Sequence, residues 1–142
     1  MEVMSHVLNP NENSWKSIQE LFQVQASQTP NEIAVVDGSL EKTYLKLDRD
    51  SDALSRAIQA IGVNQNELVA ILMESSYDYI HATLGILKSG AAFLPISTDL
   101  PDESILAILH DASPSLVLTD WAQAHRVSIT PQIAQLMLGD MV

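Results

Sequence analysis

The sequence predicts an α/β domain built on a mainly parallel sheet with helices on both faces. Short apolar segments alternate along the chain with segments whose apolar residues recur every three or four positions, as strands alternate with amphipathic helices. The apolar segments are nearly continuous, which is typical of strands covered on both faces. Because the connections are short, this rhythm favours parallel strand–helix–strand units.

The first predicted helix follows a polar N-terminal segment. Residues 1–13 are interpreted as a linker-like leader because they are polar and contain an Asn-Pro-Asn turn signal. Ser17 and Glu20 have capping-box spacing at the start of the helix, and Thr29-Pro30-Asn31 is expected to end it. The apolar stripe expected on its buried face is Trp15, Ile18, Leu21, Phe22 and Val24.

A short hairpin and a longer helix are predicted next. Residues 33–38 form a β-branched run closed by Asp-Gly, which indicates a strand and a turn, and residues 41–44 are expected to form a second short strand. The following helix should end at Gly62, a natural C-terminal glycine. Its expected buried face is Leu47, Leu54, Ala57, Ile58 and Ile61.

The central part of the sheet is predicted from residues 67–96. Residues 67–73 form an unbroken apolar strand, and residues 77–88 form a helix that Gly90 ends. Lys88 lies in the last turn, where its charge complements the helix dipole. Residues 91–96 are expected to form a short buried strand. The helix residues expected to point inward are Ile80, Leu84 and Leu87.

The remaining elements continue the same alternation. Pro101 and two acids open a helix that runs to Ala112. Residues 115–120 are predicted to form a strand, residues 121–126 a short helix, and residues 134–140 a last strand.

Composition and charge exclude several classes of function. The 142 residues suffice for one domain with a substantial core. The formal net charge is −11, with 18 acidic and 7 scattered basic residues, so neither nucleic acid nor an anionic membrane is an expected partner. The chain contains no cysteine, no apolar run that could span a bilayer and no signal-peptide pattern, and we therefore expect a cytoplasmic location.

No catalytic, cofactor-binding or metal-ligating residue is predicted. A phosphate loop needs closely spaced glycines, and no two of the five glycines are close enough. The four histidines lack metal-ligand spacing, and neither a cysteine nor a Gly-x-Ser-x-Gly nucleophile motif is present. The residues considered are Gly38, Gly62, Gly85, Gly90, Gly139, His6, His81, His110 and His125.

A phospho-receiver domain is a disfavoured alternative. Asp37 follows an apolar strand as receiver acids do, but no acceptor aspartate follows the central strand and no lysine follows Lys88. Three further acids, Asp48, Asp50 and Asp52, are interpreted as a solvated helix face near the two arginines of that helix. The aromatic residues interpreted as core or interface packing are Trp15, Phe22 and Phe93, and the two arginines are Arg49 and Arg56.

Four segments occur in the order seen in adenylation domains of nonribosomal peptide synthetases. The chain therefore resembles this group of adenylate-forming ligases, to which acyl-CoA synthetases and luciferase are related. The resemblance covers residues 14–128 and, more loosely, the end of the chain, so residues 14–142 are interpreted as a truncated N-terminal subdomain. The four segments are residues 18–38, 42–63, 66–96 and 115–120.

Two signature segments of that family can be compared directly. Residues 43–47 match its Thr-Tyr-x-Glu-Leu segment, except that Lys46 replaces the acid. Residues 87–96, LKSGAAFLPI, match its Leu-Lys-Ala-Gly-x-Ala-Tyr-x-Pro-Leu segment closely. The departures that follow are Ser97-Thr98 in place of Asp-Pro, Leu100 in place of tyrosine and Ser104 in place of arginine.

The resemblance implies an enzyme that uses ATP and magnesium to convert an amino or aryl acid to an acyl-adenylate. The acyl group then passes to the phosphopantetheine thiol of a carrier protein. In the family, the phosphate loop, the substrate pocket, the ribose-binding aspartate and the catalytic lysine lie further along the chain. We therefore expect these 142 residues to hold no cofactor and to be inactive alone.

Two roles are compatible with this resemblance. The chain is either the N-terminal piece of an adenylating enzyme, with the remainder of the adenylation domain as its partner, or a naturally truncated domain. In the second case it would act as a structural, docking or dimerisation element beside neighbouring synthase domains. Apolar faces left uncovered would favour a partner or self-association, so we expect a dimer or a tight contact within a module.

Overall fold

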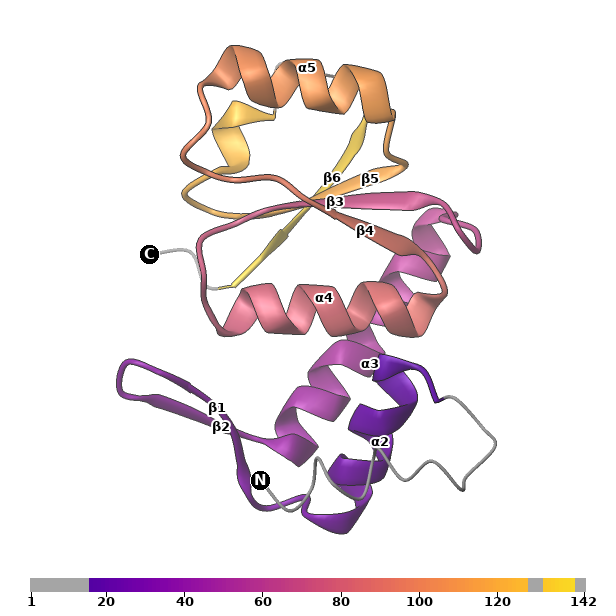
Figure 1. Ribbon diagram of the computed structural model, residues 1–142, viewed down its shortest axis with the longest axis vertical. Helices are drawn as coiled ribbons and strands as arrows, with labels where there is room; N and C mark the ends of the chain where they lie inside the picture. Colours follow the sequence, from indigo (N-terminus) through magenta and orange to yellow (C-terminus); the bar gives the residue numbers. More distant parts are fainter. Residues whose placement is uncertain (1–15, 128–131, 140–142) are drawn as a thin grey trace.

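The structure, a computed structural model, describes residues 16–127 and 132–139. Its centre is a four-stranded parallel sheet with helices on both faces, which confirms the predicted fold class (Figure 1). A separate antiparallel hairpin lies beyond the helices of one face. The sheet order is β4-β3-β5-β6, with β3 at Leu68–Leu72, β4 at Ala92–Pro95, β5 at Leu116–Asp120 and β6 at Ala134–Leu138.

Strand β3 shows why its sequence is continuously apolar. Val69 and Ile71 are buried in the core between the sheet and helices α3 and α4, whereas Ala70 and Leu72 are buried in the core on the other face, beneath α5. A strand buried on both faces has no place for alternating polar residues. The three helices are α3 at Tyr44–Ile61, α4 at Tyr77–Ser89 and α5 at Asp102–Ala112.

The N-terminal elements pack on α3 and α4 rather than on the sheet. Helix α2 (Ile18–Gln28) begins with the predicted capping box, because the Glu20 amide donates to Ser17 Oγ at 3.3 Å and the Ser17 amide donates to Glu20 Oε2 at 2.7 Å. A third, smaller core joins α3, α4, α2 and the hairpin. Its buried residues are Leu47, Tyr77 and Leu84, with Phe22, Ala34 and Val35 packed against them, and the hairpin strands are β1 at Ile33–Asp37 and β2 at Leu40–Thr43.

Helices α3 and α4 approach closely at Gly85. A Cβ atom added there would lie 2.6 Å from Leu54 Cδ2, and Leu54 is itself buried in the core. Beside this crossing, the Lys88 ammonium lies 2.7 Å from both Asp48 Oδ1 and Asp52 Oδ1. The prediction that Asp48, Asp50 and Asp52 form a solvated face near the arginines is therefore wrong, since two of these acids hold a lysine of the neighbouring helix.

Several residues predicted to be buried are exposed. Helix α2 and the ends of α3 and α4 lie at the surface. Neighbouring elements bury a narrower face of each of these helices than the apolar pattern predicted. Strand β4 is an edge strand, because β3 is its only neighbour in the described residues, so the prediction of a buried strand was wrong. The exposed apolar side chains concerned are Ile18, Val24, Ile61, Ile80 and Phe93.

Element boundaries shift in three places. Helix α3 begins at Tyr44, earlier than the apolar pattern indicated, because Thr43 Oγ1 accepts from the Lys46 amide at 3.2 Å and caps it. The second hairpin strand accordingly ends at Thr43. The predicted helix over residues 121–126 is reduced to one 3₁₀ turn, η1, at Ala124–Arg126.

The N-terminal leader and Trp15 lie outside the described residues. Within the described ranges, no helix is both long and apolar enough to cross a membrane.

Candidate functional site

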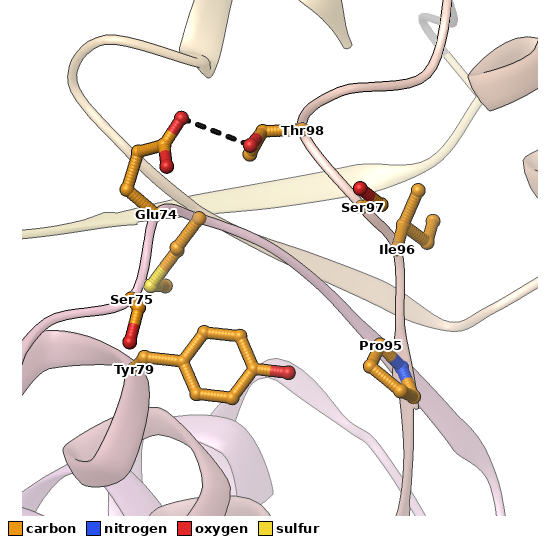
Figure 2. A pocket seen from close by; sticks show the side chains of 8 residues that line it. Glu74, Ser75, Tyr79, Pro95, Ile96, Ser97 and Thr98 are labelled. Atoms are coloured by element: carbon orange, nitrogen blue, oxygen red, sulfur yellow. Dashed lines mark hydrogen bonds between the residues drawn. The ribbon is translucent and has the colours of Figure 1, made fainter.

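A hollow lies at the carboxyl ends of β3 and β4. Its volume is about 430 Å³, and it opens beside the first turn of α4 (Figure 2). The connection from β3 runs to β4 on one side of the sheet and the connection from β5 runs to β6 on the other, so the topological switch point lies between β3 and β5, next to this hollow. Ligands of parallel α/β sheets characteristically bind outside the carboxyl ends of the strands. The lining residues are Met73, Glu74, Ser75, Tyr79, Pro95, Ile96, Ser97 and Thr98.

Hydrogen bonds join the three strand ends around this hollow. Thr98 Oγ1 donates to Glu74 Oε1 at 2.9 Å, which connects the segment after β4 to the segment after β3 (Figure 2). Asp120, the last residue of β5, accepts from the Glu74 amide at 3.2 Å and from the Gln123 amide at 2.8 Å. Glu74 supplies the one carboxylate among the residues lining the hollow, and these residues include no lysine, arginine or histidine.

Arg126 fixes the loop that forms one wall of the hollow. Its Nε lies 2.6 Å from Asp102 Oδ1, and its Nη1 donates to the Thr98 carbonyl at 2.8 Å. Nη2 also donates to the Leu100 carbonyl, so one guanidinium holds both the loop and the start of α5. Because the guanidinium is a rigid fork of donors, these contacts hold the Thr98 loop in one orientation.

The N-terminus of α4 is not a free anion site. Asp37 Oδ2, from the hairpin, accepts from the Tyr77 amide at 3.1 Å, and Ser76 Oγ accepts from the Tyr79 amide at 3.3 Å. A phosphate would have to displace a carboxylate of like charge to reach the Tyr77 amide. Asp37, which was considered as one of the acids of a receiver domain, thus caps a distant helix.

A second polar cluster lies between α3 and α4, away from the hollow. Tyr77 Oη donates to Asp50 Oδ2 at 2.5 Å, and burial together with this bond raises the pKa of Tyr77 well above its usual range. Burial opposes ionisation of Asp50, but hydrogen bonds from Lys46 and Tyr77 outweigh it and lower the pKa of Asp50. His81 Nε2 contacts the Asp50 carbonyl oxygen at 2.9 Å. This cluster joins two helices, and none of its residues lines the hollow at the strand ends.

None of the residues that line the hollow was predicted to be functional from the sequence. Glu74 and Thr98 are single polar residues that follow apolar strands, and only the order of the strands brings them together. The carboxyl ends of parallel strands lie at one edge of the sheet, so residues that directly follow the predicted strands could have been proposed to meet there. Of the histidines, His81 and His110 lie on α4 and α5, and no group of three or more possible metal ligands occurs within the described residues.

Comparison with known proteins identifies the family. The sequence profile described as AMP-binding enzyme matches residues 22–139. The chain belongs to the AMP-binding enzyme family. Gramicidin S synthase 2 of Brevibacillus brevis is 34% identical over 121 residues, which are 85% of this chain and 3% of that protein. Bacitracin synthase 3 of Bacillus licheniformis is 39% identical over 108 residues, which are 76% of this chain and 2% of that protein.

Two solved structures share the fold of this chain. The nonribosomal peptide synthetase FmoA3, solved with α-methyl-L-serine-AMP, superposes on this chain with a TM-score of 0.80 at 27% sequence identity. The superposition covers 96% of this chain and 16% of the FmoA3 chain. The N-terminal subdomain of NpsA from Klebsiella oxytoca shares the fold at a TM-score of 0.73 and 21% identity, over 87% of this chain and 30% of its own. The chain thus corresponds to the N-terminal part of a nonribosomal peptide synthetase adenylation domain and spans a small fraction of each relative.

Proposed function

We propose that this chain supplies a structural part of an amino-acid-activating adenylation domain and forms no aminoacyl-AMP by itself. In the complete enzyme, the reaction would join ATP and an amino acid into aminoacyl-AMP and release pyrophosphate. The observation that carries the proposal is the family match over residues 22–139, combined with the two buried cores of the sheet. The partner in this proposal is the remainder of the adenylation domain.

The geometry of the described residues supports inactivity of the chain alone. The family requires ATP with magnesium, yet no glycine loop, lysine or arginine lines the hollow at the strand ends. Electrostatic stabilisation of a transferring phosphoryl group needs positive charge or converging amide donors. The carboxylate of Glu74 lines the hollow instead, and capping side chains occupy amides at the N-terminus of α4.

Equilibrium dialysis of the isolated chain against Mg-ATP tests this proposal. We expect no saturable binding, and an intact amino-acid-activating domain assayed in parallel should bind the nucleotide. Saturable, stoichiometric ATP binding by the 142 residues would show that they hold a nucleotide site of their own and would contradict the proposal.

A docking or dimerisation element within a peptide or polyketide synthase is the second candidate. Uncovered apolar side chains favour it, among them Val36 and Leu40 of the hairpin and Met137 of the edge strand β6. The two candidates differ in whether the chain works with the remainder of an adenylation domain or with other domains. The cytoplasmic location remains an expectation from the sequence.

A further inference from the structure

The hollow contains polar groups whose hydrogen-bonding capacity is not used. The hydroxyls of Tyr79 and Ser75 line it, and neither makes a hydrogen bond with another described residue. Figure 2 shows the Tyr79 hydroxyl directed across the hollow toward the Pro95–Ser97 segment. Glu74 accepts from Thr98 through Oε1 alone, so Oε2 is available to a further donor. Polar groups that converge on a hollow in this way provide hydrogen bonds to a ligand.

Charge determines which ligand suits these groups. Glu74 is the only carboxylate among the lining residues, and its backbone amide donates to Asp120 Oδ2 at 3.2 Å. The whole chain carries a net charge of −11. A positively charged group is attracted to this edge of the sheet, and an anion is repelled.

Apolar side chains form the rest of the lining. Met73 and Ile96 are each 4% exposed, and they belong to the ends of β3 and β4. Pro95 beside them is exposed and offers a hydrocarbon surface next to the carboxylate. A volume of about 430 Å³ lies within the range of small-molecule sites, so a compound with a short hydrocarbon chain fits the available space.

We propose that this hollow binds a small primary amine, with its ammonium group on Glu74 and its hydrocarbon chain on Pro95, next to Met73 and Ile96. The free carboxylate of an amino acid would meet the negative charge of Glu74, so the site selects amines over amino acids. Amine binding at this site does not require an adenylation reaction. A failure to bind amines would therefore leave the proposed function unaffected, and the reverse also holds.

Hexylamine, hexanol and hexanoate are the probes that test this proposal, because they share one hydrocarbon chain and differ in charge. Each is titrated into the isotope-labelled chain, and the NMR signals of the Met73 and Ile96 methyl groups are followed. We expect saturable shifts with hexylamine, binding about fivefold weaker with hexanol, and none with hexanoate. Equal affinity for hexylamine and hexanol, or no saturable shift at these methyl groups, would overturn the proposal.

The substitution Glu74→Gln isolates the charge. Glutamine retains an oxygen that accepts from Thr98 Oγ1, so the wall of the hollow keeps its shape. We expect E74Q to bind hexylamine about fivefold more weakly and hexanol unchanged. Glu41→Gln, at an exposed position on β2, removes an equal charge outside the hollow and should leave both affinities unchanged. If E74Q and E41Q bind hexylamine alike, Glu74 is not the ammonium partner and the proposal fails.

Discussion

At the scale of single residues, Lys88 shows how one side chain can join two helices. Its side chain is 6% exposed, and its ammonium donates to the Asp48 and Asp52 carboxylates and also to the Asp48 carbonyl at 3.2 Å. The ammonium lies 5.4 Å from the centre of the Phe22 ring as well, which brings α2 into the same cluster. The sequence predicted the helix-dipole role of Lys88, but its partners lie 36 and 40 positions away and left no local signal.

Lys88→Ala is expected to lower the free energy of unfolding by about 2 kcal/mol. Its removal leaves two neighbouring carboxylates without their shared cation, although partial exposure of both limits the cost. Urea denaturation measures the change. Lys46→Ala is the matched control, because Lys46 forms an ion pair at the surface with Asp50, one turn further along α3. Its loss should lower the free energy of unfolding by at most about 0.5 kcal/mol. Equal effects of the two substitutions would contradict this role.

Tyr77 should make stability sensitive to alkaline pH. Its folded-state pKa is raised, so folding favours the neutral phenol, and this contribution is complete below the unfolded value of about 10. As the pH rises above about 10, the free energy of unfolding should fall, and Tyr77→Phe should reduce that fall. Tyr79→Phe, which removes a hydroxyl without a hydrogen-bond partner among the described residues, is the control. Parallel alkaline profiles for wild type and Y77F, measured by thermal unfolding, would refute the expectation.

At the scale of elements, the contact between α3 and α4 depends on a missing side chain. Gly85→Ala would gain about 1 kcal/mol in helix propensity, but its Cβ would overlap Leu54 within a buried core. We expect a net loss of about 1 kcal/mol or more in stability, because overpacking of a core costs about 1–3 kcal/mol.

A double-mutant cycle with Leu54→Ala checks the cause of that loss. When Leu54 is shortened, the added methyl group finds space, so G85A should become neutral or stabilising in this background. An unchanged cost of G85A in the L54A protein would show that the penalty does not come from this contact.

The order of the elements could be predicted from local patterns, whereas their exposure could not. The capping box, the Asp-Gly turn and the apolar strands each act within a few residues, and each is present in the structure. Exposure depends on which neighbours cover an element. Ile80 follows the helical apolar pattern of α4, and Phe93 lies in an apolar strand, yet both face solvent because no described element covers them.

At the scale of the whole molecule, the hollow depends on sheet topology. Glu74 forms two hydrogen bonds with distant parts of the chain. Thr98 lies 24 positions away in the sequence and Asp120 lies 46 positions away. The crossover that places β5 beside β3 brings them together. No spacing rule for a motif covers such distances, so sequence reasoning could predict a sheet edge but not the residues that meet there.

The uncovered apolar side chains predict self-association of the isolated chain. Val36 is 64% exposed on the hairpin, and Met137 is 41% exposed on β6, a strand with one free edge in the described residues. We expect light scattering to show a dimer that dissociates on dilution, and Val36→Lys combined with Met137→Lys to weaken it. A monodisperse monomer at high protein concentration would contradict this expectation.

ATP–pyrophosphate exchange by the isolated chain tests the proposed role most directly. The assay uses purified chain with Mg-ATP, labelled pyrophosphate and each of the common amino acids, beside an intact amino-acid-activating domain at equal concentration. The expected result is background exchange with every amino acid for this chain and substrate-dependent exchange for the intact domain. Amino-acid-dependent exchange by the 142 residues alone would contradict the proposal that they form a structural part of an adenylating enzyme.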